Sequence, residues 1–210
     1  MNNPETMIMA IKKEILFKDG YFEGFREKNI LDYEAQILAN YSYYQRTAVE
    51  HDKNLKQPIG YAVIINPKLK KVFAYQRANK EKEYSEKRLW GRWSWGVGGH
   101  VEKDDLEKGN PIRISTLREV EEEAGLNAKE QDLDILGYIN NDTDDVGSVH
   151  IGILYVLKTD LEEFKSTNQE IITSGMKTIE ELEEIINSQN YQVEEWAKIS
   201  WPVIKNYLKN

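Results

Sequence analysis

The chain has 210 residues, of which 40% are hydrophobic and 10% aromatic, and it carries a formal net charge of −8. This size allows one sizeable buried core, so we expect a single globular domain with an extension. The acidic balance argues against binding to a nucleic-acid duplex, because such binding depends on clustered lysine and arginine. The absence of cysteine excludes disulfides and thiolate zinc sites.

The N-terminal segment, MNNPETMIMAIKKEILF, holds only a short apolar run interrupted by charge. Such a run is too short for a signal peptide or a membrane span, so the sequence predicts a cytoplasmic protein that does not bind membranes. Residues 1–57 show no clean period and are expected to form an N-terminal extension packed on the core. Within it we predict a strand at 15–17 that leads into a turn at 18–20, an irregular cover over 21–44 and a short helix near 46–52.

From residue 58 to 210 the pattern is that of one α/β domain. The β-branched and aromatic runs YAVIIN (61–66) and KVFAYQR (71–77) predict a hairpin, with Pro67 in its turn. Residues 78–88 are highly charged and predict a solvated loop. Further strands are predicted at 89–99, where glycines break the run, at 133–140 and at 148–160. Two helices are predicted at the end, 178–188 and 193–210, the second interrupted by Pro202. A mixed sheet between helices fits this order of elements.

A helix is predicted from about residue 111 to 124. Asn110 supplies a side-chain acceptor at the N-cap, Pro111 presets φ at the first helical position, and Gly125 can end the helix in the left-handed conformation. Five apolar residues can form its buried side: Ile112, Ile114, Leu117, Val120 and Ala124.

Three glutamates of this helix are spaced for one face. Glu119, Glu122 and Glu123 stand at i, i+3 and i+4, whereas Glu121 points elsewhere. Crowded carboxylates raise one another's pKa values unless a cation lies among them, and oxygen donors suit Mg²⁺. A solvated acidic face is the plain alternative for such a charge run. The flanking glycines and helix ends favour the cation site.

These residues resemble the signature of the Nudix hydrolases. REVEEEAGL (118–126) satisfies the second half of the family's box, and GVGGHVE (96–102) matches the glycine turn before it. The resemblance implies an α/β/α sandwich with a mixed sheet over residues 58–210, and the N-terminal extension lies outside this common fold. It further implies a divalent cation, Mg²⁺ or Mn²⁺, held by Glu119, Glu122, Glu123 and the Gly98 carbonyl. Arg118 would pair with a carboxylate of the box and orient it.

The first half of the box departs from the family's pattern, because its loop is five residues longer. The expected glutamate falls on Asp105 when counted from Gly99 and on Asn110 when counted from Arg118. Asp105 and Glu107 compete as substitutes for it.

The implied activity is hydrolysis of a nucleoside diphosphate linked to another group. One of the box glutamates, or a carboxylate from a later loop, would accept the proton of the attacking water. The expected partner is thus a small nucleotide, and a homodimer is compatible with this interpretation. A Nudix-fold sensor that binds a nucleotide ligand without turnover is the alternative. An isoprenoid diphosphate isomerase would want a cysteine, and the chain has none.

Substrate-binding residues are harder to predict. Arg77 ends a strand and can meet a phosphate, although a surface ion pair is as frequent there. Trp95, Trp93 and Tyr138 can stack on a base, although aromatic residues in strands more often belong to the core. His150 fits an interior or rim histidine better than a catalytic base.

The acidic loop 141–147 either borders the site or is a solvated turn. One carboxylate outside the box is also a candidate. The segment 164–182 is expected to be a loop, and Glu170 within it is the predicted ligand or base, with Glu162 and Glu163 as rivals nearer the strand end.

Overall fold

The fold was analysed in a computed structural model that describes residues 5–78, 89–106, 109–164, 166 and 171–209. Its strands are β1 (Met7–Lys12), β2 (Gly24–Glu27), β3 (Ser42–Gln45), β4 (Leu55–Asn66), β5 (Lys71–Arg77), β6 (Arg92–Ser94), β7 (Gly96–Val97), β8 (Leu133–Asn140), β9 (His150–Lys158), β10 (Ile171–Thr178) and β11 (Gln192–Val193). The α-helices are α1 (Lys13–Leu16), α2 (Tyr33–Asn40), α3 (Arg46–Val49), α4 (Pro111–Ala124), α5 (Ile179–Asn187) and α6 (Glu195–Lys209).

A mixed sheet forms the centre of the molecule, with its main strands in the order β11-β6-β5-β4-β9-β8-β2. β4 pairs in parallel with β9 and antiparallel with β5 and β7. The predicted hairpin is confirmed, since Ile65 pairs with Val72 across the β4–β5 turn. β4 is buried along its whole length, as expected for a strand covered on both faces.

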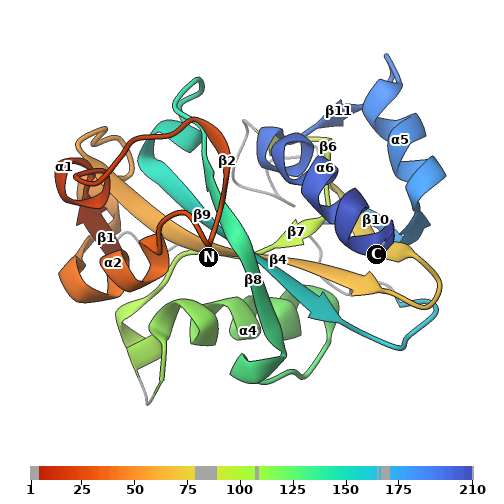
Figure 1. The fold of residues 1–210 in the computed structure, drawn as a ribbon, viewed down its shortest axis with the longest axis horizontal. Helices are drawn as coiled ribbons and strands as arrows, with labels where there is room; N and C mark the ends of the chain where they lie inside the picture. The colour runs from red at the N-terminus through yellow and green to blue at the C-terminus, as the bar shows by residue number, and fades with distance from the viewer. Residues whose placement is uncertain (1–4, 79–88, 107–108, 165, 167–170, 210) are drawn as a thin grey trace.

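Helices cover both faces of this sheet (Figure 1). Ala62 and Ile64 of β4 face the core that includes α4, whereas Tyr61, Val63 and Ile65 face the core that includes α5 and α6. The alternation follows from the two-residue period of a strand. The expected α/β/α architecture is therefore confirmed.

The N-terminal segment is more regular than its sequence predicts. Residues 15–17 are not a strand: Ile15 and Leu16 belong to α1, and the strand lies earlier, in β1. The stretch 21–44 is not an irregular cover either, because it holds β2, α2 and β3. β2 adds to the edge of the main sheet through β8, and β1 pairs with the first residues of β4. The boundary expected between residues 57 and 58 falls inside β4.

A buried carboxylate joins the N-terminal segment to α4. Glu34 of α2, 7% exposed, accepts hydrogen bonds from Asn110 (2.9 Å), from the Tyr155 hydroxyl and from Arg113 (3.3 Å). A buried carboxylate needs such partners to offset its lost hydration. The segment thereby fixes the beginning of the helix that carries the glutamates.

Two expectations for the C-terminal third are wrong. Residues 171–178 are not loop but strand β10, which pairs with β5 over its whole length. Pro202 does not interrupt the last helix, because α6 continues through it. The apolar stripe of Trp201, Ile204 and Leu208 is buried against the sheet, and this packing outweighs the hydrogen bond that proline removes. The described residues include no helix long and apolar enough to cross a membrane.

Candidate functional site

A cavity of about 810 Å³ opens beside the glycine turn that follows β7. Its walls come from β4, the turn at residues 98–100, α4, the loop after β8, the start of α6 and, from the N-terminal segment, α3. Residues far apart in sequence thus face one space of a size that takes a nucleotide.

Helix α4 has the predicted bounds and the predicted ends. The Asn110 side chain accepts from the backbone N–H of Ile112 and Arg113, and Gly125 ends the helix at φ 66°. Its buried face differs in part from the prediction, because Ser115 and Thr116 are buried and Ile114 is not. The reason is close packing on β4, where a Cβ atom at Gly60 would lie 1.7 Å from the Thr116 hydroxyl.

The cluster of glutamates divides between the cavity and the surface. Glu119 and Glu123 line the cavity. The Glu122 side chain is 60% exposed and lies near Arg118, at 3.7 Å, and Glu121 is exposed on another side. Gly99 leaves room for this arrangement, since a Cβ atom there would lie 2.2 Å from a Glu119 carboxylate oxygen.

Arg118 lies between two carboxylates. Its guanidinium donates to both carboxylate oxygens of Asp105, at 3.1 and 3.3 Å, and to Glu119 at 2.7 Å. It also donates to the His100 carbonyl at 3.2 Å. A forked donor of this kind fixes the orientation of its acceptors. Arg118 therefore orients Glu119, as the resemblance implies for it.

Asp105 is one of the candidates for the glutamate expected in the first half of the box. It is 7% exposed, contacts Arg118, and accepts from the backbone N–H of Glu102 at 2.8 Å. Asn110 instead caps α4. The third candidate, Glu107, lies outside the described residues.

The carboxylate oxygens of Glu119 and Glu123, which line the cavity, suit a hard cation. Burial raises the pKa of Glu119, the nearby Glu122 carboxylate raises it further, and Arg118 offsets part of this effect. Within the described ranges no three acidic or histidine side chains already converge on one point. Glu119, Glu123 and Gly98 nevertheless border one space. Carboxylate and backbone carbonyl oxygens are ligands that fit Mg²⁺ or Mn²⁺, and Glu122 lies next to them on the helix.

Arg77 lines the cavity but is engaged with the protein. It is 9% exposed, and its Nε donates to Glu194 at 2.5 Å while one NH₂ group donates to the Tyr75 hydroxyl at 3.1 Å. The alternative prediction, a surface ion pair at this strand end, is therefore wrong, because the ion pair of Arg77 with Glu194 is buried.

Trp95 does not border the cavity, so its prediction as a substrate-binding residue is wrong. Its indole is fully buried, donates to Ser200 at 3.1 Å and packs edge-on against Trp201. Trp93 and Tyr138 also lie in the core. Strand alternation turns these rings toward the helices.

Two other aromatic residues do border the cavity. Trp196, half-buried at the start of α6, lies edge-on to Tyr61 of β4 with ring centroids 5.7 Å apart. Trp196 is partly buried against the core cluster that holds Ala197, Trp201 and Ile204. No local pattern separates it from these residues.

His150 lies at the rim, as predicted. Its Nδ1 is 2.6 Å from the Val146 carbonyl and its Nε2 is 3.1 Å from Nε2 of His100. A carbonyl only accepts, so Nδ1 of His150 carries the hydrogen, and between two neutral rings His100 then donates to His150. Burial lowers the pKa of His100 well below its usual value, and His150 and Arg46 add to this effect.

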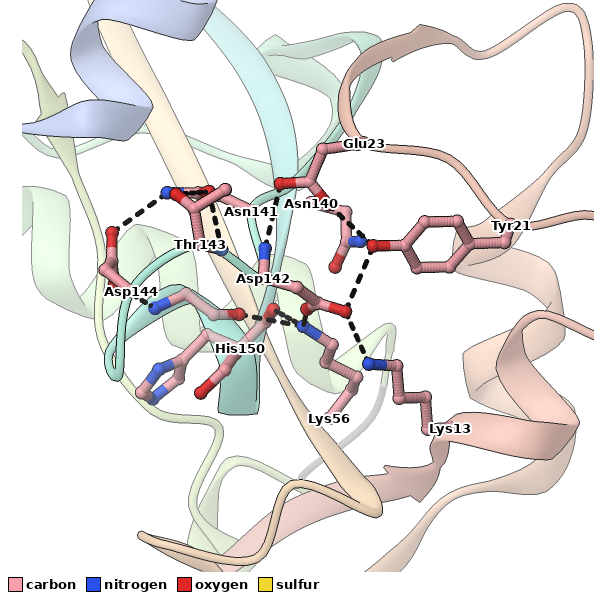
Figure 2. Close-up of polar contacts among 12 residues, drawn as sticks. Lys13, Tyr21, Glu23, Lys56, Asn140, Asn141, Asp142, Thr143, Asp144 and His150 are labelled. Carbon is pink, nitrogen blue, oxygen red and sulfur yellow. Dashed lines mark hydrogen bonds and ion pairs between the residues drawn. The ribbon is translucent and has the colours of Figure 1, made fainter.

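The loop 141–147 borders the cavity through residues 143–147. Figure 2 shows the polar contacts of its residues Asn141 to Asp144. Glu170, by contrast, lies outside the described residues, so its predicted role stays a prediction. Its rival Glu162 is exposed. Glu163 pairs with Lys71 at 2.9 Å and is also exposed.

Sequence reasoning missed several residues of this site. Arg46 and Glu50 line the cavity from α3, and Lys56 is buried behind the loop 141–147. No local pattern marks them, because their positions depend on how the N-terminal segment folds over β4.

Known proteins resemble this chain in sequence and in fold. No protein-family model matches the chain. The chain is 34% identical to Protein YmaB of Bacillus subtilis (strain 168) over 165 residues, which are 75% of this chain and 78% of that protein. The crystal structure of Tm1382, a proposed Nudix hydrolase, superposes with a TM-score of 0.75 at 29% identity, covering 96% of this chain and 99% of that chain.

A more distant structure shares the fold. It is a bifunctional NMN adenylyltransferase/ADP ribose pyrophosphatase from Francisella tularensis, complexed with AMP and a manganese ion. The TM-score is 0.53 at 15% identity, over 73% of this chain and 42% of that one.

Proposed function

Because this chain belongs to the Nudix family, we propose that it is a divalent-cation-dependent hydrolase of nucleoside diphosphates linked to a second group. The observation that carries the proposal is that Glu119, Glu123 and Gly98 line one cavity. A cation bound there would lower the pKa of a water molecule and balance charge on the phosphoryl oxygens.

The chain's own residues have separable roles in this proposal. Glu119, Glu122 and Glu123 hold the Mg²⁺ or Mn²⁺ ion together with the Gly98 carbonyl, and a carboxylate oxygen of this group accepts the proton of the attacking water. Arg118 and Asp105 keep Glu119 in place, supported by their hydrogen bonds.

Two other residues that line the cavity, Arg77 and Trp196, suit substrate binding. The Arg77 guanidinium borders the cavity and can donate to a phosphate oxygen, while Glu194 holds its orientation. Trp196 presents an indole beside Tyr61, a surface on which a base can stack. Glu170 remains the proposed additional carboxylate of the site.

Replacing Trp196 with alanine is expected to raise KM about tenfold or more with kcat little changed, because stacking stabilises the bound substrate and its transition state alike. Tyr191→Ala, at an exposed ring, is the control. An unchanged KM in Trp196→Ala would remove the indole from substrate binding.

The proposed function is tested by a screen of nucleoside diphosphate derivatives, with Mg²⁺ or Mn²⁺, in which hydrolysis is followed by phosphate release after phosphatase treatment. We expect turnover of at least one compound that disappears when the cation is chelated. Binding of a nucleotide without turnover of any compound would contradict an enzyme and indicate a ligand sensor.

A further inference from the structure

Lys56 is a fully buried lysine behind the cavity wall. Its side chain on β4 is 0% exposed, and its ammonium donates to Asp142 at 2.6 Å, to the Gly147 carbonyl at 2.8 Å and to the His150 carbonyl at 3.0 Å. These contacts use all three N–H groups of the ammonium. Since all three acceptors lie between residues 142 and 150, the charge ties this one stretch of chain to the central strand (Figure 2).

The same stretch is held from its other side by the N-terminal segment. The Asp142 carboxylate accepts from Lys13 of α1 and from the Tyr21 hydroxyl, and its backbone N–H donates to Glu23 at 2.9 Å. Burial raises the pKa of Asp142, but hydrogen bonds from Lys13 and Lys56 outweigh that effect and leave its pKa below the usual value. These contacts therefore hold Asp142 in place, and residues 143–147, which follow it, line the cavity.

The cavity wall held in this way belongs to one end of the cavity, which we term the α3 end. It comprises Arg46, Glu50, His100, Glu102, residues 143–147 and His150. The pairing of Gln57 with His150 and of Ile59 with His100 places this end at the beginning of β4, before Tyr61.

The charges of the α3 end disfavour an anion. Four acidic residues line it: Glu50, Glu102, Asp144 and Asp145. Asp145 pairs with Lys53 at 3.2 Å, which leaves three carboxylates against the single guanidinium of Arg46, 3.4 Å from Glu50. A further phosphate would be repelled there, whereas hydroxyl groups can donate to carboxylates and accept from a guanidinium. None of the described residues lining this end is a phenylalanine, tyrosine or tryptophan, and the imidazoles of His100 and His150 are bound to each other at 3.1 Å. The larger stacking surface for a base is therefore that of Trp196.

We propose that the α3 end selects an uncharged, hydroxyl-bearing group of the substrate, and that Lys56 is the positioning residue that fixes this end in its binding shape. The proposal rests on the proposed function, in which the reaction takes place at the cation site of Glu119, Glu122 and Glu123. It assigns the N-terminal segment a role in substrate selection, because that segment supplies Arg46, Glu50 and the contacts that hold Asp142.

The test compares Lys56→Met with the parent on two probes, ADP-ribose, which carries a terminal sugar, and ATP, which carries a further phosphate instead. The parent is expected to favour ADP-ribose. In Lys56→Met, kcat/KM for ADP-ribose should fall at least about tenfold through KM, with kcat within about threefold, whereas kcat/KM for ATP stays within about threefold. Lys158→Met, which breaks a half-exposed ion pair with Asp134, is the matched control and should alter neither probe.

Three outcomes would overturn the proposal. One is an unchanged KM for ADP-ribose in folded Lys56→Met, and another is a parent that prefers ATP. The third is an equal fall in kcat/KM for both probes, which a purely structural role of Lys56 predicts. If Lys56→Met does not fold, Asp142→Asn, which keeps an acceptor for Lys13 and Lys56, decides by the same criteria.

If the parent hydrolyses neither probe, that result counts against the proposed function and not against the role of Lys56. Calorimetric titration with ADP-ribose then gives the answer, because the probe is not consumed. Binding at least about tenfold weaker in Asp142→Asn than in the parent supports the proposal. Equal binding, or no binding by the parent, overturns it.

Discussion

Replacing Glu123 with glutamine is expected to lower kcat by at least about a hundredfold and to leave the fold intact. Glu123 is 8% exposed and borders the cavity. Glutamine keeps the shape of the side chain but removes the negative charge that a bound cation and a departing proton require. Glu119→Gln and Glu122→Gln are expected to act in the same direction, because all three belong to the proposed cation site.

Glu121→Gln is the matched control for these variants. It makes the same chemical change in the same helical turn, but its side chain is exposed away from the cavity. Steady-state rates at saturating Mn²⁺, with circular dichroism to verify folding, provide the comparison. Near-parental rates in both Glu119→Gln and Glu123→Gln would refute the assignment of the cation site.

Replacing Arg118 with alanine is expected to lower the free energy of unfolding by about 3 kcal/mol, the lower end of the range for breaking a buried ion pair. The side chain of Arg118 is 31% exposed, but that of its partner Asp105 is only 7% exposed, and the variant leaves this carboxylate without the guanidinium. The rate should fall as well, because Glu119 loses the donor that orients it.

A double-mutant cycle with Asp105→Asn separates the two consequences. If the guanidinium and the Asp105 carboxylate act as a pair, the second change should cost much less in the Arg118→Ala background than alone. Denaturant unfolding measures the stability and steady-state kinetics the rate. Strict additivity of the two losses in stability would contradict the pairing.

The parts of the fold that local sequence patterns determine were predicted well. Helix α4 has the predicted bounds because Asn110, Pro111 and Gly125 each act within one turn of their own position. Strand β8 coincides with the predicted run 133–140 for the same reason, since Ile135, Tyr138 and Ile139, which favour strands, lie within it.

The parts that depend on contacts distant in sequence were not predicted. Ile172, for example, is exposed and is followed by Thr173 and Ser174, and only the pairing of β10 with β5 makes its segment a strand. Trp95 has the composition of a stacking residue, but the direction of its side chain depends on which sheet face α6 covers. Arg46 reaches the cavity, and Lys56 reaches the loop behind the cavity wall, through the fold of the N-terminal segment, and no motif spans that separation.

The central claim is that a divalent cation binds at Glu119 and Glu123. In the metal-free protein these two carboxylates should lower the stability of the folded state. The pKa of Glu119 is raised in the folded state, so its contribution to stability is present below the unfolded pKa and is lost as the pH rises through the folded pKa. Near neutral pH, Glu119→Gln is therefore expected to be neutral or stabilising without metal.

Thermal unfolding of the parent and of Glu119→Gln/Glu123→Gln at neutral pH, with and without Mn²⁺, tests this claim most directly. At a free ion concentration a hundred times Kd, binding to the folded state adds about 2.7 kcal/mol, which corresponds to a rise in Tm of roughly 5 to 10 °C for a chain of this size. We predict this rise in the parent and its loss in the double variant. An unchanged Tm in the parent, or an equal rise in both proteins, would contradict the account.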